Sequence, residues 1–90
     1  MDQDVFAGKL RAIEVAQAIV DGRIPPYEGA RRMWMDVWPQ ISEDKLGDRL
    51  LGFIGEATEW DAHPEARPVI EEGIRRNASK LLAEWGDEAN

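Results

Sequence analysis

The chain has 90 residues, which suffices for one small domain built around a single hydrophobic core. Its 18 acidic and 11 basic residues give a net charge of −7. A field of that sign repels phosphate backbones, so we expect no nucleic-acid binding. The absence of cysteine excludes disulfides and thiolate metal sites.

The N-terminal stretch MDQDVFAGKL carries acids where a signal peptide carries bases. No run approaches the roughly 18 apolar residues that a membrane span requires. A hydrophobic content of 43% with 32% charged residues is typical of a globular protein. We therefore expect a cytoplasmic protein without membrane association.

The first predicted helix covers residues 4–21. Asp2 or Asp4 can cap its start, where exposed backbone N–H groups favour a carboxylate. Gly22 is placed to end it, because glycine adopts the left-handed conformation after a helix without strain. The apolar residues at helical spacing are Val5, Phe6, Ile13, Ala16, Ile19 and Val20.

The second predicted helix covers residues 26–38. Pro26 suits the first helical position, where its missing N–H costs nothing. Pro39 is expected to close the segment, because proline disfavours helical geometry in the residue before it. A broad apolar arc is formed by Ala30, Met33, Trp34, Val37 and Trp38.

The third predicted helix covers residues 43–61, with Ser42 as its N-cap. Its apolar face is predicted to consist of Leu46, Leu50, Phe53, Ala57 and Trp60. Its three glycines, which we expect to allow close helix approach or to mark a bend, are Gly47, Gly52 and Gly55.

The fourth predicted helix covers residues 69–85 and is expected to stop at Gly86, which leaves a loose tail. One face carries the apolar residues Ile70, Ile74, Ala78, Leu81, Leu82 and Trp85. No segment alternates polar and apolar residues for long enough to be a strand. The sequence therefore predicts one all-α domain over residues 1–90, a compact bundle of four amphipathic helices joined by short loops.

Three side chains raise the hypothesis of a metal site. Glu56, Glu59 and His63 would share a polar face on a continuous helix, and carboxylates with an imidazole can bind zinc or iron. Pro64 weakens this hypothesis, because it disfavours helical geometry at His63. The favoured interpretation is a solvated helix end with a surface histidine and no cofactor.

Asp61 is predicted to lie on the apolar side of the third helix as that helix ends. A carboxylate there needs a partner, because an unpaired buried charge is costly. Arg67 and Arg31 are the candidate partners. For Arg31, which lies at the rim of the Trp34/Trp38 face, the favoured interpretation is a structural ion pair or a guanidinium stacked on an indole. The alternative is a recessed polar spot that binds a ligand or a partner.

Two segments, DGRIPPYEGARRM and FIGEATEWDAHPEARP, resemble those of a widespread group of small bacterial helical proteins of the domain-of-unknown-function type. The resemblance implies a bacterial, all-helical protein and no established activity. Trp60 and His63 depart from the pattern of that group. The matching positions are Glu28, Gly29, Arg31, Glu59, Asp61 and Pro64.

These considerations lead to one hypothesis about a site. We expect a polar cluster of Arg31, Glu59, Asp61 and Arg67 where the end of the third helix meets the second. The distance between Arg31 and Asp61 tests this expectation.

The favoured function is a non-enzymatic protein-interaction module that binds a basic protein partner, as toxin-neutralising immunity proteins do. The alternative is a metal-binding protein or a small carboxylate-dependent enzyme that uses the Glu56–His63 region. A third alternative is a homodimer that buries apolar surface around Met33, Met35 and the tryptophans.

Overall fold

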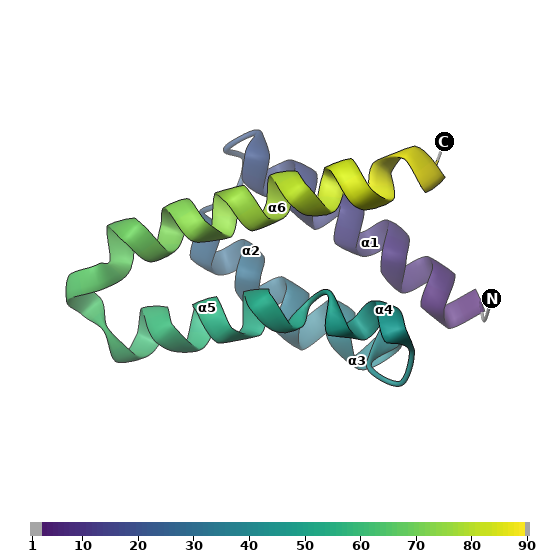
Figure 1. The fold of residues 1–90 in the computed structure, drawn as a ribbon, viewed down its shortest axis with the longest axis horizontal. Coiled ribbons are helices and arrows are strands. Elements are labelled where there is room, and N and C mark those ends of the chain that lie inside the picture. Colours follow the sequence, from purple (N-terminus) through teal and green to yellow (C-terminus); the bar gives the residue numbers. More distant parts are fainter. Residues whose placement is uncertain (1–2, 90) are drawn as a thin grey trace.

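A computed structural model describes residues 3–89, and within them the fold is an all-α bundle without strands (Figure 1). The prediction of fold class is therefore confirmed. Four helical segments follow one another along the described part of the chain. Their elements are α1 (Gln3–Val20), α2 (Pro26–Arg32), the π-helical turn η1 (Met33–Val37), α3 (Trp38–Ile41), α4 (Lys45–Asp48), α5 (Leu51–Ala62), the 3-10 turn η2 (Pro64–Ala66) and α6 (Arg67–Ala89).

Helices α5 and α6 form an antiparallel hairpin that runs along the long axis of the molecule (Figure 1). Helix α1 packs most extensively on α6, and α2 packs on α5. The α5–α6 connection lies at one end of the molecule, and both ends of the chain lie at the other (Figure 1). No helix in the described part is long and apolar enough to cross a membrane.

The end of α1 follows the prediction. Gly22 has a φ of 76°, a left-handed conformation that glycine adopts without strain. The backbone N–H of Arg23 donates to the carbonyl of Ala18 at 2.9 Å, so the chain folds back over the last turn of α1. Asp2 lies outside the described residues, and Asp4 lies within the helix rather than at its cap.

The second helical segment continues past Pro39, contrary to the prediction, and ends at Ile41. In a regular α-helix the proline ring would clash with the carbonyl four residues earlier. The wider π-helical turn η1 precedes Pro39 and alters the path of the backbone there, with the N–H of Trp38 donating to the carbonyl of Met33.

The third helical segment begins two residues later than predicted, at Lys45. Its cap is Asp44, whose carboxylate accepts from the N–H of Leu46 at 2.9 Å, and not Ser42. A turn at residues 49–50 separates α4 from α5, so the segment is bent, as its glycines suggested. The fourth segment begins at Arg67 and continues through Gly86 to Ala89, so the predicted stop at Gly86 is wrong.

The core lies where α1, α2, α5 and α6 face one another. Trp85 is buried, whereas Trp34 and Trp38 are half-buried and pack against the core. Met33 is also fully buried and so cannot serve the dimer surface proposed for it, although Met35 is exposed. The largest fully buried side chains are Phe53, Ile19, Met33, Ile41, Leu50, Ile74, Leu81 and Val37.

Candidate functional site

An aromatic stack joins the start of α2 to the end of α5. Tyr27 follows Pro26 in the first turn of α2, and Trp60 lies in the last turn of α5. Their ring centroids are 3.9 Å apart with an interplanar angle of 20°. Stacked rings at this separation stabilise a contact beyond the area they bury. The stack therefore links two helices that are far apart in sequence.

Arg67 extends this stack. Its guanidinium carbon lies 3.8 Å from the Trp60 ring centroid, and its Nε donates to the Trp60 carbonyl at 3.1 Å. Two planar groups this close to one ring cannot share a face, so Arg67 and Tyr27 contact opposite faces of Trp60. The short turn η2 makes the contact possible, because it reverses the chain between Trp60 and Arg67. The sequence predicted guanidinium-on-indole stacking for Arg31, whereas the structure shows it for Arg67.

Asp61 binds a tyrosine rather than an arginine. The Tyr27 hydroxyl donates to Asp61 Oδ1 at 2.7 Å. Asp61 is exposed, so the prediction that it lies on the apolar side of the helix is wrong. Arg31 lies over the other member of the pair, with its guanidinium carbon 5.9 Å from the Tyr27 ring centroid. Arg31 and Asp61 thus both contact Tyr27, and their convergence as one polar cluster stays a prediction.

The bond to Asp61 changes the chemistry of Tyr27. The hydrogen bond that Tyr27 donates to Asp61 raises the pKa of Tyr27. Desolvation and the negative charge of Asp61 act in the same direction. Arg31 opposes the rise, because its positive charge favours the phenolate. Tyr27 therefore remains a hydrogen-bond donor to Asp61 across the neutral pH range.

Glu59, the fourth residue of the predicted polar cluster, does not join the stack. Its carboxylate lies 3.3 Å from His63 Nε2, and Glu65 lies 3.2 Å from His63 Nδ1. A hydrogen bond from its own backbone lowers the pKa of Glu65, and His63 lowers it further against desolvation. His63 is thus flanked by two exposed carboxylates at the hairpin turn.

The three residues of the metal hypothesis are divided between two surroundings. Glu56 accepts from Asn77 Nδ2 at 3.2 Å, on the α6 side of the hairpin, while Glu59 and His63 pair with each other. Among residues 5–86, whose side chains the structure describes, no group of three or more histidine, aspartate or glutamate side chains could hold a metal ion.

A second polar network, which the sequence did not indicate, joins the α4–α5 junction to α6. Arg49 Nε donates to Glu84 at 2.6 Å and its Nη1 donates to Asn77 Oδ1 at 2.6 Å. Asn77 in turn donates a hydrogen bond to Glu56, which extends the network to α5. Burial raises the pKa of Glu56, although Asn77 and the nearby arginines, including Arg49, lower it. Helical periodicity along the chain does not reveal this pairing of Arg49 with Glu84, because it gives no distance between two helices.

A shallow groove lies beside this network, between α5 and α6, with a volume of about 390 Å³. A side chain at Gly73 would meet the Glu56 carboxylate, and one at Gly52 would meet the Asn77 amide. We call it the glycine groove, and its lining consists of Gly52, Gly55, Glu56, Glu59, Val69, Ile70 and Gly73.

Several polar groups at this end of the hairpin are hydrogen-bonded within the molecule. Thr58, the hydroxyl nearest to these carboxylates in sequence, donates to the Ile54 carbonyl of its own helix at 2.9 Å. The polar groups of the stack are likewise occupied by one another. What remains accessible is a set of carboxylates around an apolar groove.

The comparisons with known proteins give no match, whether with family models, curated proteins or solved structures. The class that the fold defines is an all-α bundle. The resemblance to small bacterial helical proteins therefore stays a prediction.

Proposed function

We propose that the chain is a non-enzymatic binding module that docks the end of its α5–α6 hairpin on a basic protein partner. The observation that carries this proposal is Val69. It is 75% exposed, the highest value among the large apolar side chains that the structure describes, and it lines the glycine groove together with Glu59. An exposed apolar side chain set among charges is typical of a docking surface.

The surrounding charge favours a basic partner. Glu59, Glu65 and Glu72 have exposed side chains, at 63%, 72% and 67%. We call this surface the acidic tip, defined by Glu59, Glu65, Glu72 and Val69. Complementary charge across an interface speeds encounter and fixes orientation, and rim charges act mainly through long-range attraction.

The glycine groove gives the partner a shape as well as a charge. Because its glycines carry no side chains, a backbone or apolar side chain of a partner could approach α5 and α6 closely. Glu56 and Glu59 also line the groove. An amphipathic segment with apolar residues on one side and lysine or arginine on the other would fit both features.

Cross-linking in an extract of the source organism, followed by mass spectrometry, would identify the partner and its contact residues. The purified partner would then be titrated against the wild type, V69D and the charge reversal E59K/E65K. We expect each variant to weaken binding at least about tenfold, and the wild-type affinity to fall as salt rises.

The matched controls are V20D, at another exposed valine, and E43K/D48K, at acids outside the hairpin. Both should bind as the wild type does. Equal loss in the controls, contacts mapped away from the acidic tip, or affinity that is independent of salt would contradict the proposal.

A further inference from the structure

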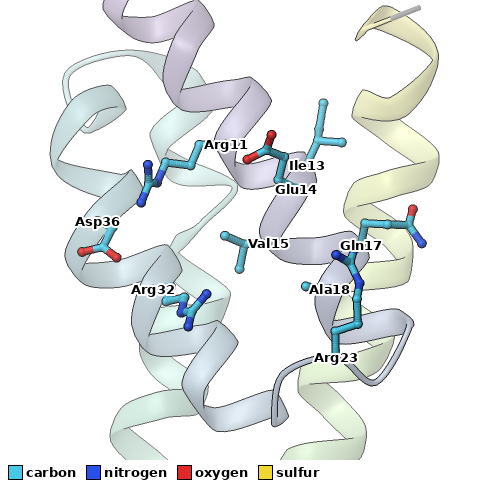
Figure 2. A pocket seen from close by; sticks show the side chains of 9 residues that line it. All are labelled: Arg11, Ile13, Glu14, Val15, Gln17, Ala18, Arg23, Arg32 and Asp36. Carbon is cyan, nitrogen blue, oxygen red and sulfur yellow. The ribbon is translucent and has the colours of Figure 1, made fainter.

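A second concave surface lies between α1 and the α2–η1 segment (Figure 2), with a volume of about 570 Å³. It shares no lining residue with the glycine groove. Three arginines line it, in a chain whose net charge is −7. We call it the arginine pocket, and its lining consists of Arg11, Ile13, Glu14, Val15, Gln17, Ala18, Arg23, Arg32 and Asp36.

The three arginines come from different elements. Arg11 lies on α1 and Arg32 at the end of α2. Arg23 follows the left-handed Gly22, and its backbone bond to Ala18 returns it to the last turn of α1. In Figure 2, Arg11 and Arg32 lie on one side of Val15, and Arg23 lies on the other beside Gln17. Their guanidinium groups therefore border one hollow from separate directions.

The existing ion pairs leave most of this donor capacity unused. Arg23 lies 3.3 Å from Asp21, and Arg32 lies 3.5 Å from Glu28, both at exposed positions where such pairs are weak. Arg11 has no ion-pair partner among the described residues. Since each guanidinium carries five N–H donors, the pocket can supply several more hydrogen bonds.

We propose that the arginine pocket binds a small organic phosphate monoester. Guanidinium groups that approach from several directions suit a tetrahedral oxyanion, whereas one planar carboxylate is satisfied by a single bidentate arginine. Ile13, Val15 and Ala18 supply apolar surface for the organic part of the ligand. The volume falls within the range of about 300–1,000 Å³ typical of small-molecule sites.

The charge distribution selects a small ligand over a nucleic acid. A polyanion would extend beyond the pocket and meet the acidic surface of the rest of the molecule. Glu14 and Asp36 also line the pocket, so two carboxylates offset the three arginines and the positive field stays local, which suits a small anion rather than a polyanion. The proposal is independent of the acidic tip.

Phenyl phosphate, benzoate and inorganic phosphate are the probes for an isothermal titration of the full chain. We expect saturable binding of phenyl phosphate, with at least about tenfold weaker binding of benzoate and of inorganic phosphate. Equal affinity for benzoate would overturn the choice of a phosphate group. Equal affinity for inorganic phosphate would overturn the role of the apolar surface, and absence of saturation would overturn the site.

Variants locate the site. R11A and R32A should each weaken phenyl phosphate binding about tenfold, and R32K should lose part of the affinity because lysine cannot bind in a bidentate manner. The matched control is R75A, because Arg75 is exposed to 49%, against 47% for Arg32, and pairs with Glu72 at the same 3.5 Å. Circular dichroism would confirm that each variant is folded. Equal loss in R75A would show non-specific attraction and overturn the proposal.

Discussion

Tyr27 joins three functional groups at one point. Its ring stacks on Trp60, its hydroxyl donates to Asp61, and Arg31 lies over its ring. It is the only tyrosine in the chain. Its ionisation can therefore be followed without interference from another phenol.

The first prediction concerns the pKa of Tyr27. D61N removes the carboxylate whose hydrogen bond and charge raise that pKa, so we expect the pKa of Tyr27 to fall toward its ordinary value of about 10. Absorbance near the phenolate band would record the titration. The control is D48N, at an exposed aspartate outside the stack. An unchanged midpoint in D61N would contradict the role of Asp61.

The raised pKa of Tyr27 also determines how the stability of the fold changes with pH. A tyrosine whose pKa is higher in the folded than in the unfolded state contributes stability that is complete below the unfolded value. That contribution is lost as pH rises through the folded value. We therefore expect wild type to lose more stability than D61N in this alkaline window, measured as the difference between their urea midpoints.

Part of this site could be predicted because opposite charges near a helix end require partners. Arg31, Asp61 and Arg67 were selected on that ground, and each of them contacts Tyr27 or Trp60. Tyr27 and Trp60 mediate the contact and were not selected, because helical periodicity does not give the distance between two helices. Glu59 was grouped both with these residues and with Glu56 and His63, and of these it pairs with His63.

At the scale of elements, the number of helical segments followed from apolar periodicity, whereas their ends depended on local backbone chemistry. Pro39 and Gly86 were expected to end helices and lie within them. In the first case a π-helical turn accommodates the proline; in the second the helix continues through the glycine. Asp44 and Ser42 are both good caps by composition, and only the backbone path distinguishes them.

Two glycines of the third segment give a matched prediction. A side chain at Gly47 would meet the carbonyl oxygen of Ile41 and the backbone of Ser42 at 2.9 Å. Backbone cannot move aside cheaply, so G47A should lower the free energy of unfolding by about 1–3 kcal/mol. A Cβ added at Gly55 would have no neighbouring atom within 4 Å outside its own helical backbone. G55A should therefore raise the free energy of unfolding by about 0.5–1 kcal/mol through helix propensity.

Urea unfolding of both variants at neutral pH would measure these changes, with an unchanged slope as the check on two-state behaviour. Gly55 serves as the control for Gly47, since both substitutions add one methyl group in the same helical segment. Similar effects in the two variants would show that close packing at Gly47 does not govern its identity.

At the scale of the whole molecule, the net charge of −7 is spread over a small surface. Self-repulsion of like charges destabilises a compact state, and salt screens it. Raising ionic strength from about 0.01 to 0.1 M shortens the screening length from about 30 to about 10 Å. We expect this change to stabilise the fold by about 0.5 kcal/mol, which corresponds to a rise of about 2–4 °C in Tm.

Differential scanning calorimetry in sodium chloride would measure this rise. The variant E43Q/D48N has two fewer exposed negative charges and should show a smaller rise. A fall in Tm with salt would mean that attractive pairs such as Arg49–Glu84 outweigh the repulsion.

The positions of residues 3 and 89 relative to the hairpin turn determine how the protein can be tethered. Both ends of the chain lie at one end of the long axis and the α5–α6 connection lies at the other (Figure 1), in a molecule that extends 41 Å along that axis. A sensor surface or fused domain attached at either end would therefore leave the acidic tip pointing into solution. Under the proposed function, the partner would therefore approach from the end of the molecule opposite the tether.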